Sequence, residues 1–446
     1  MKLSKERIIE EVKTSANPKV KVAITDIDGI LRGKYLHKDK FMSSLDGGFG
    51  FCNVVFGWDS GDVAYEGMDF TGWHTGYPDA IARLDPQSFR KVPWDEDVPF
   101  FLGDFNLDIC PRNLLRKVKA RAEQAGFHAN FGQEFEWFNF RETPEALHER
   151  NFSDPKPLTP GMFGYSLLRM SRNSDFLNDL YDLMFQFGIP LEGLHTETGP
   201  GVLEAAILYA DVLESADRAV LFKAGAKEIG LKYGIMPTFM AKINEKLPGC
   251  SGHLHQSLSD GKSNLFFDEK GRNKMSPLME SYLAGLLHCM PEILPLYAPT
   301  INSYKRLVEG AWAPTTLTWG IDNRTVAIRA LPGGSKSTRI ELRVVGSDAN
   351  PYLAHAASLA SGLYGIQKGL KLTVPATEGN GYRNTSNGVL PPNLWEATAR
   401  FKNSDVAKEL LGEDFVKHFA GTREWEWRQH AKAVTDWEYK RYFEII

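Results

Sequence analysis

The chain has 446 residues, of which 43% are hydrophobic and 24% charged, with a formal net charge of −4. These values are typical of a globular protein with one large or two ordinary domains, and they argue against extensive disorder. No basic block stands out, so we expect no nucleic-acid partner. The four cysteines are scattered without a CxxC pair, which argues against a disulfide framework or structural zinc and predicts a reducing, cytoplasmic location.

The first 15 residues predict an amphipathic helix and contain no apolar signal core. No segment approaches the roughly 18 uninterrupted apolar residues of a membrane-spanning helix. We therefore expect no membrane partner.

The N-terminal quarter predicts a small unit with a mixed sheet. Residues 20–36 predict two strands joined by a hairpin turn at Asp28-Gly29, because apolar residues alternate before the turn. Residues 46–75 are rich in Gly, Asp and aromatic residues without a clear period, which predicts an irregular loop held by other surfaces. Residues 81–105 predict short strands around two prolines. Residues 1–107 are therefore expected to form an α+β unit.

The pattern changes at Pro111, which starts a predicted helix that Gly126 ends. From there helices and strands alternate to the end of the chain, so we expect a second, larger domain over residues 108–446. Its other predicted helices lie within 217–233, 276–288, 351–369 and 393–446. A polar loop is predicted over residues 376–392.

Two carboxylates lie in an aromatic-rich segment, GQEFEWFNF, which predicts a buried strand. Glu134 and Glu136 are two residues apart and therefore point to the same face of that strand. Buried side by side, they repel unless a cation neutralises them, so a divalent metal is favoured. The alternative is an edge strand with two solvated acids.

Two further segments carry groups that suit a metal. In HTETGPGVLE, a Gly-Pro turn between two strands brings Glu197 and Glu204 together, although a polar hairpin tip would look the same. In GCSGHLHQSL, His253 and His255 share one strand face. Carboxylates joined by one imidazole suit Mg²⁺ or Mn²⁺, whereas a lone histidine pair is more often structural.

Arginines gather between residues 306 and 343, among alternating apolar strand residues. Arg339, Glu341 and Arg343 share one strand face. Guanidinium groups bind carboxylate and phosphate with two hydrogen bonds, so this group predicts an anion-binding cavity; surface ion pairs are the alternative. The segment GGSKST at 333–338 lacks the spacing of a phosphate-binding P-loop.

In their order along the chain, these segments resemble the glutamine synthetase family. The resemblance runs over nearly the whole chain, strongly after residue 107 and loosely before it. The segments that carry it are GQEFEWFNF, HTETGPGVLE, TFMAKI, GCSGHLHQSL, APTINSYKRL, NRTVAIR, RIELR, DANPYLA and TDWEYKRYF. The resemblance implies an α+β fold: a small β-grasp domain followed by a large catalytic domain with an open, antiparallel, barrel-like sheet.

The resemblance also implies roles for individual residues. Two or three Mg²⁺ or Mn²⁺ ions are expected per active site, with ligands Glu136, Glu197 and Glu204 at one position and Glu134, His253 and Glu341 at another. Positions near ATP are Glu192, His255, Ser257, Lys336 and Arg339. Arg324 and Arg329 match the arginines that hold the transferred phosphoryl group. Gly249, Arg306 and Arg343 match the glutamate pocket.

The implied reaction is ATP-dependent ligation of the glutamate γ-carboxylate to an amine through γ-glutamyl phosphate. The implied assembly is a homo-oligomer of stacked rings, a dodecamer or decamer, with active sites between subunits. In such a ligase the metal ions offset the repulsion between the ATP phosphates and the glutamate carboxylate, and the arginines stabilise the charge on the transferred phosphoryl group.

One position departs from the members that use ammonia. Their flap glutamate is replaced by Trp312, which can neither accept a proton nor balance ammonium by charge. This favours the branch that makes γ-glutamyl amides from larger amines. Acids in the 46–75 loop would suit a polyamine, whereas its aromatic residues favour a short alkyl or aryl amine.

Three alternatives remain at this point. Glu309 could supply the missing carboxylate in an ordinary, ammonia-using glutamine synthetase. The chain could be an inactive structural or regulatory ring protein, although the intact set of acids, histidines and arginines argues against it. A guanidino kinase with a related core would release a phosphorylated product and no amide.

Overall fold

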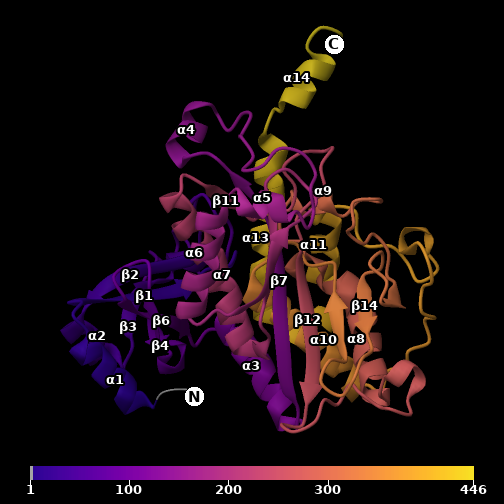
Figure 1. The fold of residues 1–446 in the computed structure, drawn as a ribbon, viewed down its shortest axis with the longest axis horizontal. Coiled ribbons are helices and arrows are strands. Elements are labelled where there is room, and N and C mark those ends of the chain that lie inside the picture. Colours follow the sequence, from indigo (N-terminus) through magenta and orange to yellow (C-terminus); the bar gives the residue numbers. More distant parts are fainter. Residues whose placement is uncertain (1–3) are drawn as a thin grey trace.

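The computed structural model describes residues 4–446, and two sheets organise them (Figure 1). The smaller sheet has six strands in the order β2-β1-β6-β4-β3, with β5 paired to β6. β1 runs parallel to β6 and antiparallel to β2, so the sheet is mixed, as predicted. Its strands are β1 (Lys19–Thr25), β2 (Leu31–His37), β3 (Phe49–Cys52), β4 (Asp79–Leu84), β5 (Arg90–Val92) and β6 (Val98–Phe105).

The predicted hairpin turn joins β1 to β2. Gly29 has φ +82°, a conformation that favours glycine, and a Cβ there would lie 3.1 Å from the Asn350 Cα. Asn350 donates hydrogen bonds from Nδ2 to the carbonyl oxygens of Asp26 and Ile27. The tip of this N-terminal hairpin therefore packs directly on the C-terminal part of the chain.

The larger sheet has nine strands in the order β13-β14-β15-β12-β7-β9-β8, with β10 and β11 also paired to β7. All pairs are antiparallel except β13 with β14. The strands are β7 (His128–Phe140), β8 (Leu191–Thr196), β9 (Val202–Ile207), β10 (Ala210–Asp211), β11 (Met236–Thr238), β12 (Gly252–Ser259), β13 (Trp319–Ile321), β14 (Ile328–Leu331) and β15 (Arg339–Leu342).

Helices cover one face of this sheet, and their apolar residues form the main cores with it. The α-helices are α1 (Lys5–Thr14), α2 (Lys38–Ser44), α3 (Pro111–Gln124), α4 (Pro144–Glu149), α5 (Leu167–Ser171), α6 (Ser174–Gln186), α7 (Val212–Lys232), α8 (Pro277–Ile293), α9 (Ser303–Arg306), α10 (Pro351–Gln367), α11 (Leu394–Asn403), α12 (Asp405–Leu411), α13 (Glu413–Lys432) and α14 (Asp436–Tyr442). Short 3₁₀ turns are η1 (Asn53–Phe56), η2 (Pro86–Ser88), η3 (Arg272–Lys274), η4 (Leu294–Leu296) and η5 (Gly381–Arg383).

Two predicted helices are longer than the sequence pattern indicated. α7 begins at Val212 rather than near residue 217, because the Asp211 side chain accepts a hydrogen bond from the Leu213 amide and caps it. α8 continues past His288 to Ile293 and includes Pro291 near its end. None of the helices in residues 4–446 has the length and apolarity needed to cross a membrane.

The 46–75 segment is irregular apart from β3 and η1, and α13 holds it in place. Trp425 on α13 donates its indole N–H to Asp59 at 2.9 Å, and its ring meets that of Tyr65 edge-on at 6.0 Å. Lys417, also on α13, forms an ion pair with Asp69. The prediction that other surfaces pin this loop is confirmed.

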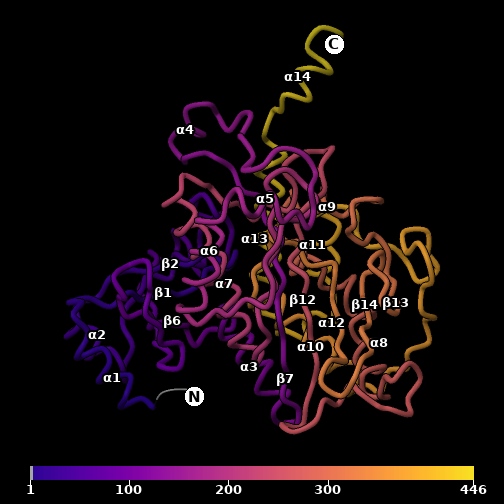
Figure 2. Tube along the Cα trace, in the orientation of Figure 1, coloured from indigo at the N-terminus to yellow at the C-terminus, as the bar shows by residue number. Residues whose placement is uncertain are grey.

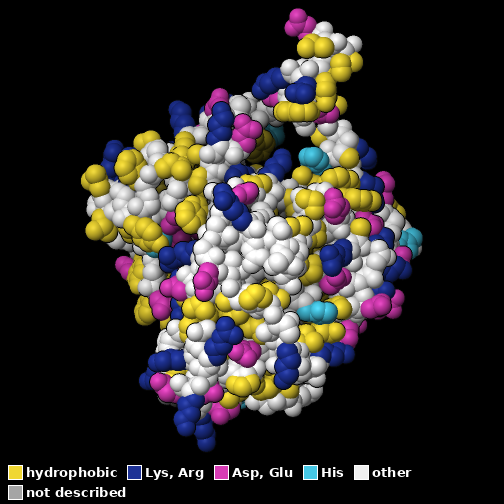
Figure 3. Space-filling model, turned by 90° about the vertical axis from the view of Figure 1, so that its right-hand side faces the viewer, with side chains coloured by type: hydrophobic (Ala, Val, Ile, Leu, Met, Phe, Trp, Pro, Cys, Tyr) yellow, Lys and Arg dark blue, Asp and Glu magenta, His cyan; other side chains and the backbone are white. Residues whose placement is uncertain are grey.

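The last helix, α14, projects beyond the rest of the chain, as the trace in Figure 2 shows. In Figure 3 it stands clear of the body and carries a group of hydrophobic side chains. Its most exposed apolar residues, with the residues that follow it, are Trp437, Tyr439, Phe443, Ile445 and Ile446.

Candidate active site

Strand β7 separates its residues cleanly between two faces. Phe135 and Trp137 are fully buried against Phe222 of α7 and against Phe239. The alternating residues Glu134 and Glu136 therefore project from the opposite face. The prediction that they point the same way from a buried strand is confirmed.

Strand register extends this charged face across the sheet. His253 on β12 pairs with Glu134, and His255 pairs with Glu341 on β15. Arg329 on β14 also pairs with Glu341. On the other side of β7, Glu136 pairs with Glu204 on β9, which pairs in turn with His195 on β8. A row of acids, imidazoles and a guanidinium thus crosses six strands, from β14 to β8.

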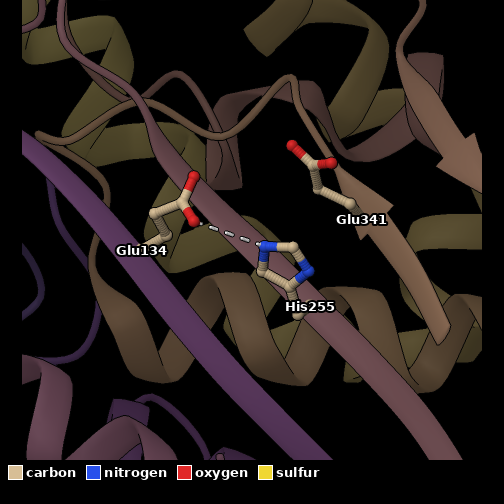
Figure 4. Close-up of side chains that lie close together, drawn as sticks. All are labelled: Glu134, His255 and Glu341. Atoms are coloured by element: carbon tan, nitrogen blue, oxygen red, sulfur yellow. Dashed lines mark ion pairs between the residues drawn. The ribbon is translucent and has the colours of Figure 1, made fainter. Parts of the chain in front are cut away.

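The first cluster contains Glu134, Glu341 and both histidines of β12. His253 Nδ1 lies 3.1 Å from Glu134 and 3.6 Å from Glu341, and His255 Nε2 lies 3.7 Å from Glu134. Figure 4 shows the two carboxylates on either side of the His255 imidazole. The structure thus brings together Glu134, His253 and Glu341, as the resemblance implied. The three side chains whose ligand atoms lie close enough to share one ion are, however, Glu134, His255 and Glu341.

Neighbouring imidazoles and guanidinium groups favour the ionised form of these two carboxylates. Burial opposes ionisation of Glu134, but His253 and His255 hold its pKa well below the ordinary value. For Glu341, burial is likewise outweighed by His253 and the neighbouring arginines, and its pKa falls to about 2.

The second cluster contains Glu197 and Glu204, joined by His195. His195 lies 3.5 Å from Glu204 and 3.9 Å from Glu197. The predicted turn between β8 and β9 therefore does bring the two acids together, and Glu204 lies within β9. Burial, with the charges of Glu134 and Glu136, raises the pKa of Glu204 to about 8 despite its contact with His195.

Glu136 lies between the clusters and is held by the turn before β12. The Ser251 amide donates to Glu136 Oε2 at 2.6 Å. Arg306 braces that turn, because its guanidinium donates to Ser251 Oγ and to the carbonyl oxygens of Val344 and Arg343. A Cβ on Gly249 would lie 2.8 Å from the Arg306 side chain. The Arg306 side chain is only 1% exposed and donates these three hydrogen bonds within the protein, so it stabilises the turn.

The other arginines differ in the number of hydrogen bonds and ion pairs that they form within the protein. Arg343 forms an ion pair with Glu341, and its buried Nε has no partner among the described residues. Arg329 bonds Glu341 at 2.8 Å and also pairs with Asp322. Arg339 donates to His255 at 3.2 Å. Within residues 4–446, Arg324 is exposed and forms no hydrogen bond or ion pair, so its guanidinium is free for a ligand.

The remaining expected residues lie around this face. Ser257 follows the two histidines on β12, and Glu192 is exposed where the β8–β9 register shifts. Lys336 is exposed in the loop between β14 and β15. Trp312 is 59% exposed in the segment after α9 and has φ +57°, which is unusual for a side-chain-bearing residue.

Sequence reasoning did not assign a role to Tyr165. Its ring stacks on that of His195 with centroids 4.4 Å apart, although thirty residues separate them. The Tyr165 amide donates to the Thr196 carbonyl oxygen at 2.7 Å, which fixes the segment against the end of β8. No periodicity in the 160–168 segment indicates this contact, because it depends on a tertiary pairing.

The residues fit a divalent cation. Several carboxylates converge from different strands, burial and the like charges of Glu134 and Glu136 raise the pKa of Glu204, and the buried Nε2 of His253 lacks a partner among the described residues. Oxygen ligands with one imidazole are the donors that Mg²⁺ and Mn²⁺ accept.

Comparison with known proteins agrees with this geometry. A family model described as glutamine synthetase, catalytic domain, matches residues 108–442. The Dictyostelium discoideum protein named type-1 glutamine synthetase 2 is 55% identical, covering 98% of this chain and 86% of its own. A Pseudomonas protein named glutamate–isopropylamine ligase is 37% identical, covering 96% and 95%. A solved structure of GmaS in complex with ADP has a TM-score of 0.84 at 29% identity, covering 98% of this chain and 99% of that one.

Proposed function

The chain belongs to the glutamine synthetase family, and we propose that it is a glutamate–amine ligase whose amine is larger than ammonia. ATP phosphorylates the γ-carboxylate of glutamate, the amine nitrogen attacks the acyl carbon of γ-glutamyl phosphate, and phosphate leaves. The observation that carries this proposal is the row of acids, imidazoles and arginines on one sheet face, with a neutral Trp312 at the flap position.

Two metal positions are proposed on this face, from carboxylates and an imidazole of the two clusters together with Glu136, which lies between them. Glu134, His253 and Glu341 would hold one ion, and Glu136, Glu197 and Glu204 the other. Bound Mg²⁺ or Mn²⁺ supplies charge that offsets the repulsion between ATP and the glutamate carboxylate. Ring stacking on Tyr165 and ion pairs with the acids fix His195 between Glu197 and Glu204.

The arginines divide between stabilising transferred charge and holding substrate. Arg324, with no protein partner among the described residues, is free to meet the migrating phosphoryl oxygens, and Arg329 supports that position from β14. Arg343 retains an unpartnered Nε for the glutamate carboxylate. Arg306 contributes by holding the turn at Gly249 and Ser251. Glu192, His255, Ser257, Lys336 and Arg339 are proposed to surround ATP.

Trp312 supports the choice of a larger amine. An exposed indole offers apolar surface and a π face, but no carboxylate to balance ammonium or take its proton. An alkyl or aryl amine gains contact with this ring that ammonia cannot make. Within the 46–75 loop, several acids already have partners: Asp46 pairs with Lys5, Asp59 with Trp425 and Asp62 with Arg32. This favours an amine without a distal charge over a polyamine.

Ordinary glutamine synthesis from ammonia is the second candidate. The 55% identity to the Dictyostelium protein favours it, and Glu309 is exposed in the same segment as Trp312. In that case Glu309, three residues before Trp312, would supply the missing carboxylate.

A ring assembly with active sites between subunits, dodecameric or decameric, is part of the proposal. The exposed aromatic residues of α14 support it, since apolar side chains on a projecting helix are typical of an interface. We also propose that residues 1–107 and 108–446 are separate domains. A cytoplasmic location stays a prediction.

Phosphate release tests the proposal. Glutamate, ATP and Mg²⁺ are combined with ammonia, methylamine, isopropylamine, ethanolamine, putrescine, spermidine or aniline, and products are identified by mass. We expect a γ-glutamyl amide of one organic amine to form with a kcat/KM well above that for ammonia. If ammonia is preferred, the second candidate holds. A phosphorylated product without amide would indicate a kinase, and no turnover an inactive ring protein.

A further inference from the structure

A second site lies away from the acidic face. A cavity of ≈ 710 Å³ opens between the N-terminal sheet and α7, within the range of roughly 300–1,000 Å³ of small-molecule pockets. Phe135 alternates with Glu134 and Glu136 on β7 and lies 5.6 Å from the ammonium of Lys223, which lines this cavity. The cavity is therefore on the side of β7 opposite the proposed metal ligands.

One wall of the cavity is aromatic. Its four rings come from both parts of the chain and are Trp94, Phe100, Phe187 and Phe239. Trp94 is fixed there, because its indole N–H donates to Glu228 at 2.6 Å and its carbonyl accepts from Lys232 at 2.8 Å. Gly225 permits this approach, since a Cβ on it would lie 2.9 Å from the Trp94 ring. The wall is thus a preformed apolar surface.

Two lysines one helical turn apart on α7 face this cavity. Lys223 donates only to backbone carbonyls, those of Ser347 at 2.8 Å and Ala349 at 3.3 Å, and lies 5.4 Å from the Phe239 ring. Lys227 lies 5.9 Å from the same ring. Among the described residues neither lysine forms an ion pair with a carboxylate. Like charges at this spacing destabilise a helix, so an anion between them would relieve that cost.

The acidic residues of the cavity are mostly occupied elsewhere. Asp28 pairs with Arg423 at 2.6 Å, and Glu228 binds Trp94 and lies 3.5 Å from Lys21. Asp348 accepts from Thr300 and Ser303 through one oxygen, and its other oxygen is buried without a partner. Glu426 is the one lining carboxylate in the described chain with no hydrogen bond or ion pair, and burial raises its pKa. Lys34 donates to the Gly50 carbonyl.

Burial also acts on the two lysines. It lowers the pKa of Lys223 to about 7, with a further contribution from Lys227, and it lowers the pKa of Lys227 as well. Asp348 opposes this shift at Lys223, but among the described residues no carboxylate forms an ion pair with either lysine, so an anionic ligand would supply a directly paired charge.

We propose that this cavity binds a small organic anion, with its carboxylate at Lys223 and Lys227 and its apolar body against the aromatic wall. A charged hydrogen bond at one end and ring contacts at the other define the ligand class. This cavity is separate from the proposed reaction site on the acidic face, and the binding of an anion here does not depend on the proposed function.

Calorimetric titration of the full-length protein with 3-phenylpropionate tests the site. Its matched partner is 3-phenylpropylamine, which has the same apolar body and the opposite charge. We expect the acid to bind once per chain and the amine not to bind. Lys227→Met should weaken binding of the acid at least about tenfold, because one charged hydrogen bond is lost. Lys432→Met, an exposed lysine at the end of α13, should change nothing.

Several results would overturn the proposal. The proposal is wrong if wild-type protein does not bind 3-phenylpropionate, or if the Lys227→Met variant binds it as tightly as wild type does. It is also wrong if the protein prefers 3-phenylpropylamine, because Glu426 would then be the residue that binds the charged end of the ligand. Competition by ATP or glutamate would place the acid in the reaction site instead. Lys227 is exposed at the cavity mouth, so its substitution leaves the fold intact, and thermal unfolding of each variant checks this.

Discussion

Two buried charge networks in this molecule are built differently. At the junction of the two sheets, Arg112 bonds Asp217 with two hydrogen bonds at 2.9 Å and bonds Asp85 and Asp104 at 2.7 Å each. Arg116 bonds the same two aspartates, and Tyr352 donates to Asp217. Every carboxylate there has a guanidinium partner.

The acidic face of the larger sheet lacks that balance. Imidazoles and arginines lower the pKa values of Glu134 and Glu341, whereas burial, with the charges of Glu134 and Glu136, raises the pKa of Glu204 although His195 lies 3.5 Å away. A network whose charges are matched within the protein can only hold elements together. A network whose acids lie close to one another suits the proposed cation, and this is the difference between the two networks that the predictions below test.

The largest effect is expected at the matched network. Arg112→Met removes the guanidinium that bonds Asp217 and leaves Asp85 and Asp104 to Arg116 alone, and breaking a buried ion pair costs about 3–5 kcal/mol. Urea unfolding should show this loss, with little change in activity per folded molecule. Arg7→Met, which breaks an exposed pair with Glu11, should cost under about 1 kcal/mol. Equal costs for the two variants would mean that the network is solvated.

The unmatched network should respond in the opposite way. Glu136→Ala removes a proposed metal ligand, so phosphate release at saturating substrates should fall at least about a hundredfold. The free energy of unfolding should fall less, relative to wild type, in Glu136→Ala than in Arg112→Met. Glu123→Ala, at an exposed position on α3, serves as the control. An active Glu136→Ala enzyme would contradict the metal assignment.

Arg324 tests the free guanidinium at the edge of this face. Arg324→Ala should also lower phosphate release about a hundredfold, because charge on the migrating phosphoryl group loses its partner. Thermal stability should not change, since Arg324 has no partner among the described residues. Arg272→Ala, an exposed residue on η3, is the control, and a similar rate in both variants would remove Arg324 from the mechanism.

Acid should weaken the matched network within a defined range of pH. Burial opposes the ionisation of Asp85, but Arg112 and Arg116 outweigh it and lower the pKa of Asp85 to about 2 from an unfolded value of 3.8. Its contribution, roughly 2 kcal/mol, is therefore complete above about pH 4 and is lost as pH falls toward 2. The difference in unfolding free energy between wild type and Asp85→Asn should shrink over that interval. A constant difference would contradict the assignment.

The smallest effect concerns amine choice. Trp312→Glu should shift the ratio of kcat/KM values for ammonia and the best organic amine about tenfold toward ammonia, because the carboxylate can balance ammonium. Trp395→Glu, on α11, changes charge at another exposed tryptophan and should leave the ratio unchanged. If both variants leave the ratio unchanged, Trp312 has no part in selecting the amine.

Much of the larger sheet could be predicted, because strand alternation is local. Glu134 and Glu136 were placed on one face, and His253 and His255 on another strand, from period alone. The start of α7 was missed, since its cap at Asp211 lies outside the apolar pattern. The brace made by Arg306 and the stacking of Tyr165 on His195 were also not predictable, because each joins segments far apart in the chain.

The sequence by itself determined which residues carry charge, which face of each strand they share and which family the order of segments resembles. Only the tertiary structure decided that His255 and Arg329 both pair with Glu341 across the sheet. It also decided that Arg306 donates its hydrogen bonds to Ser251 and to two backbone carbonyls, and that Arg112 bonds three aspartates. Residue type and period are local properties, whereas strand order, register and the partners of a buried charge depend on which distant segments pack together.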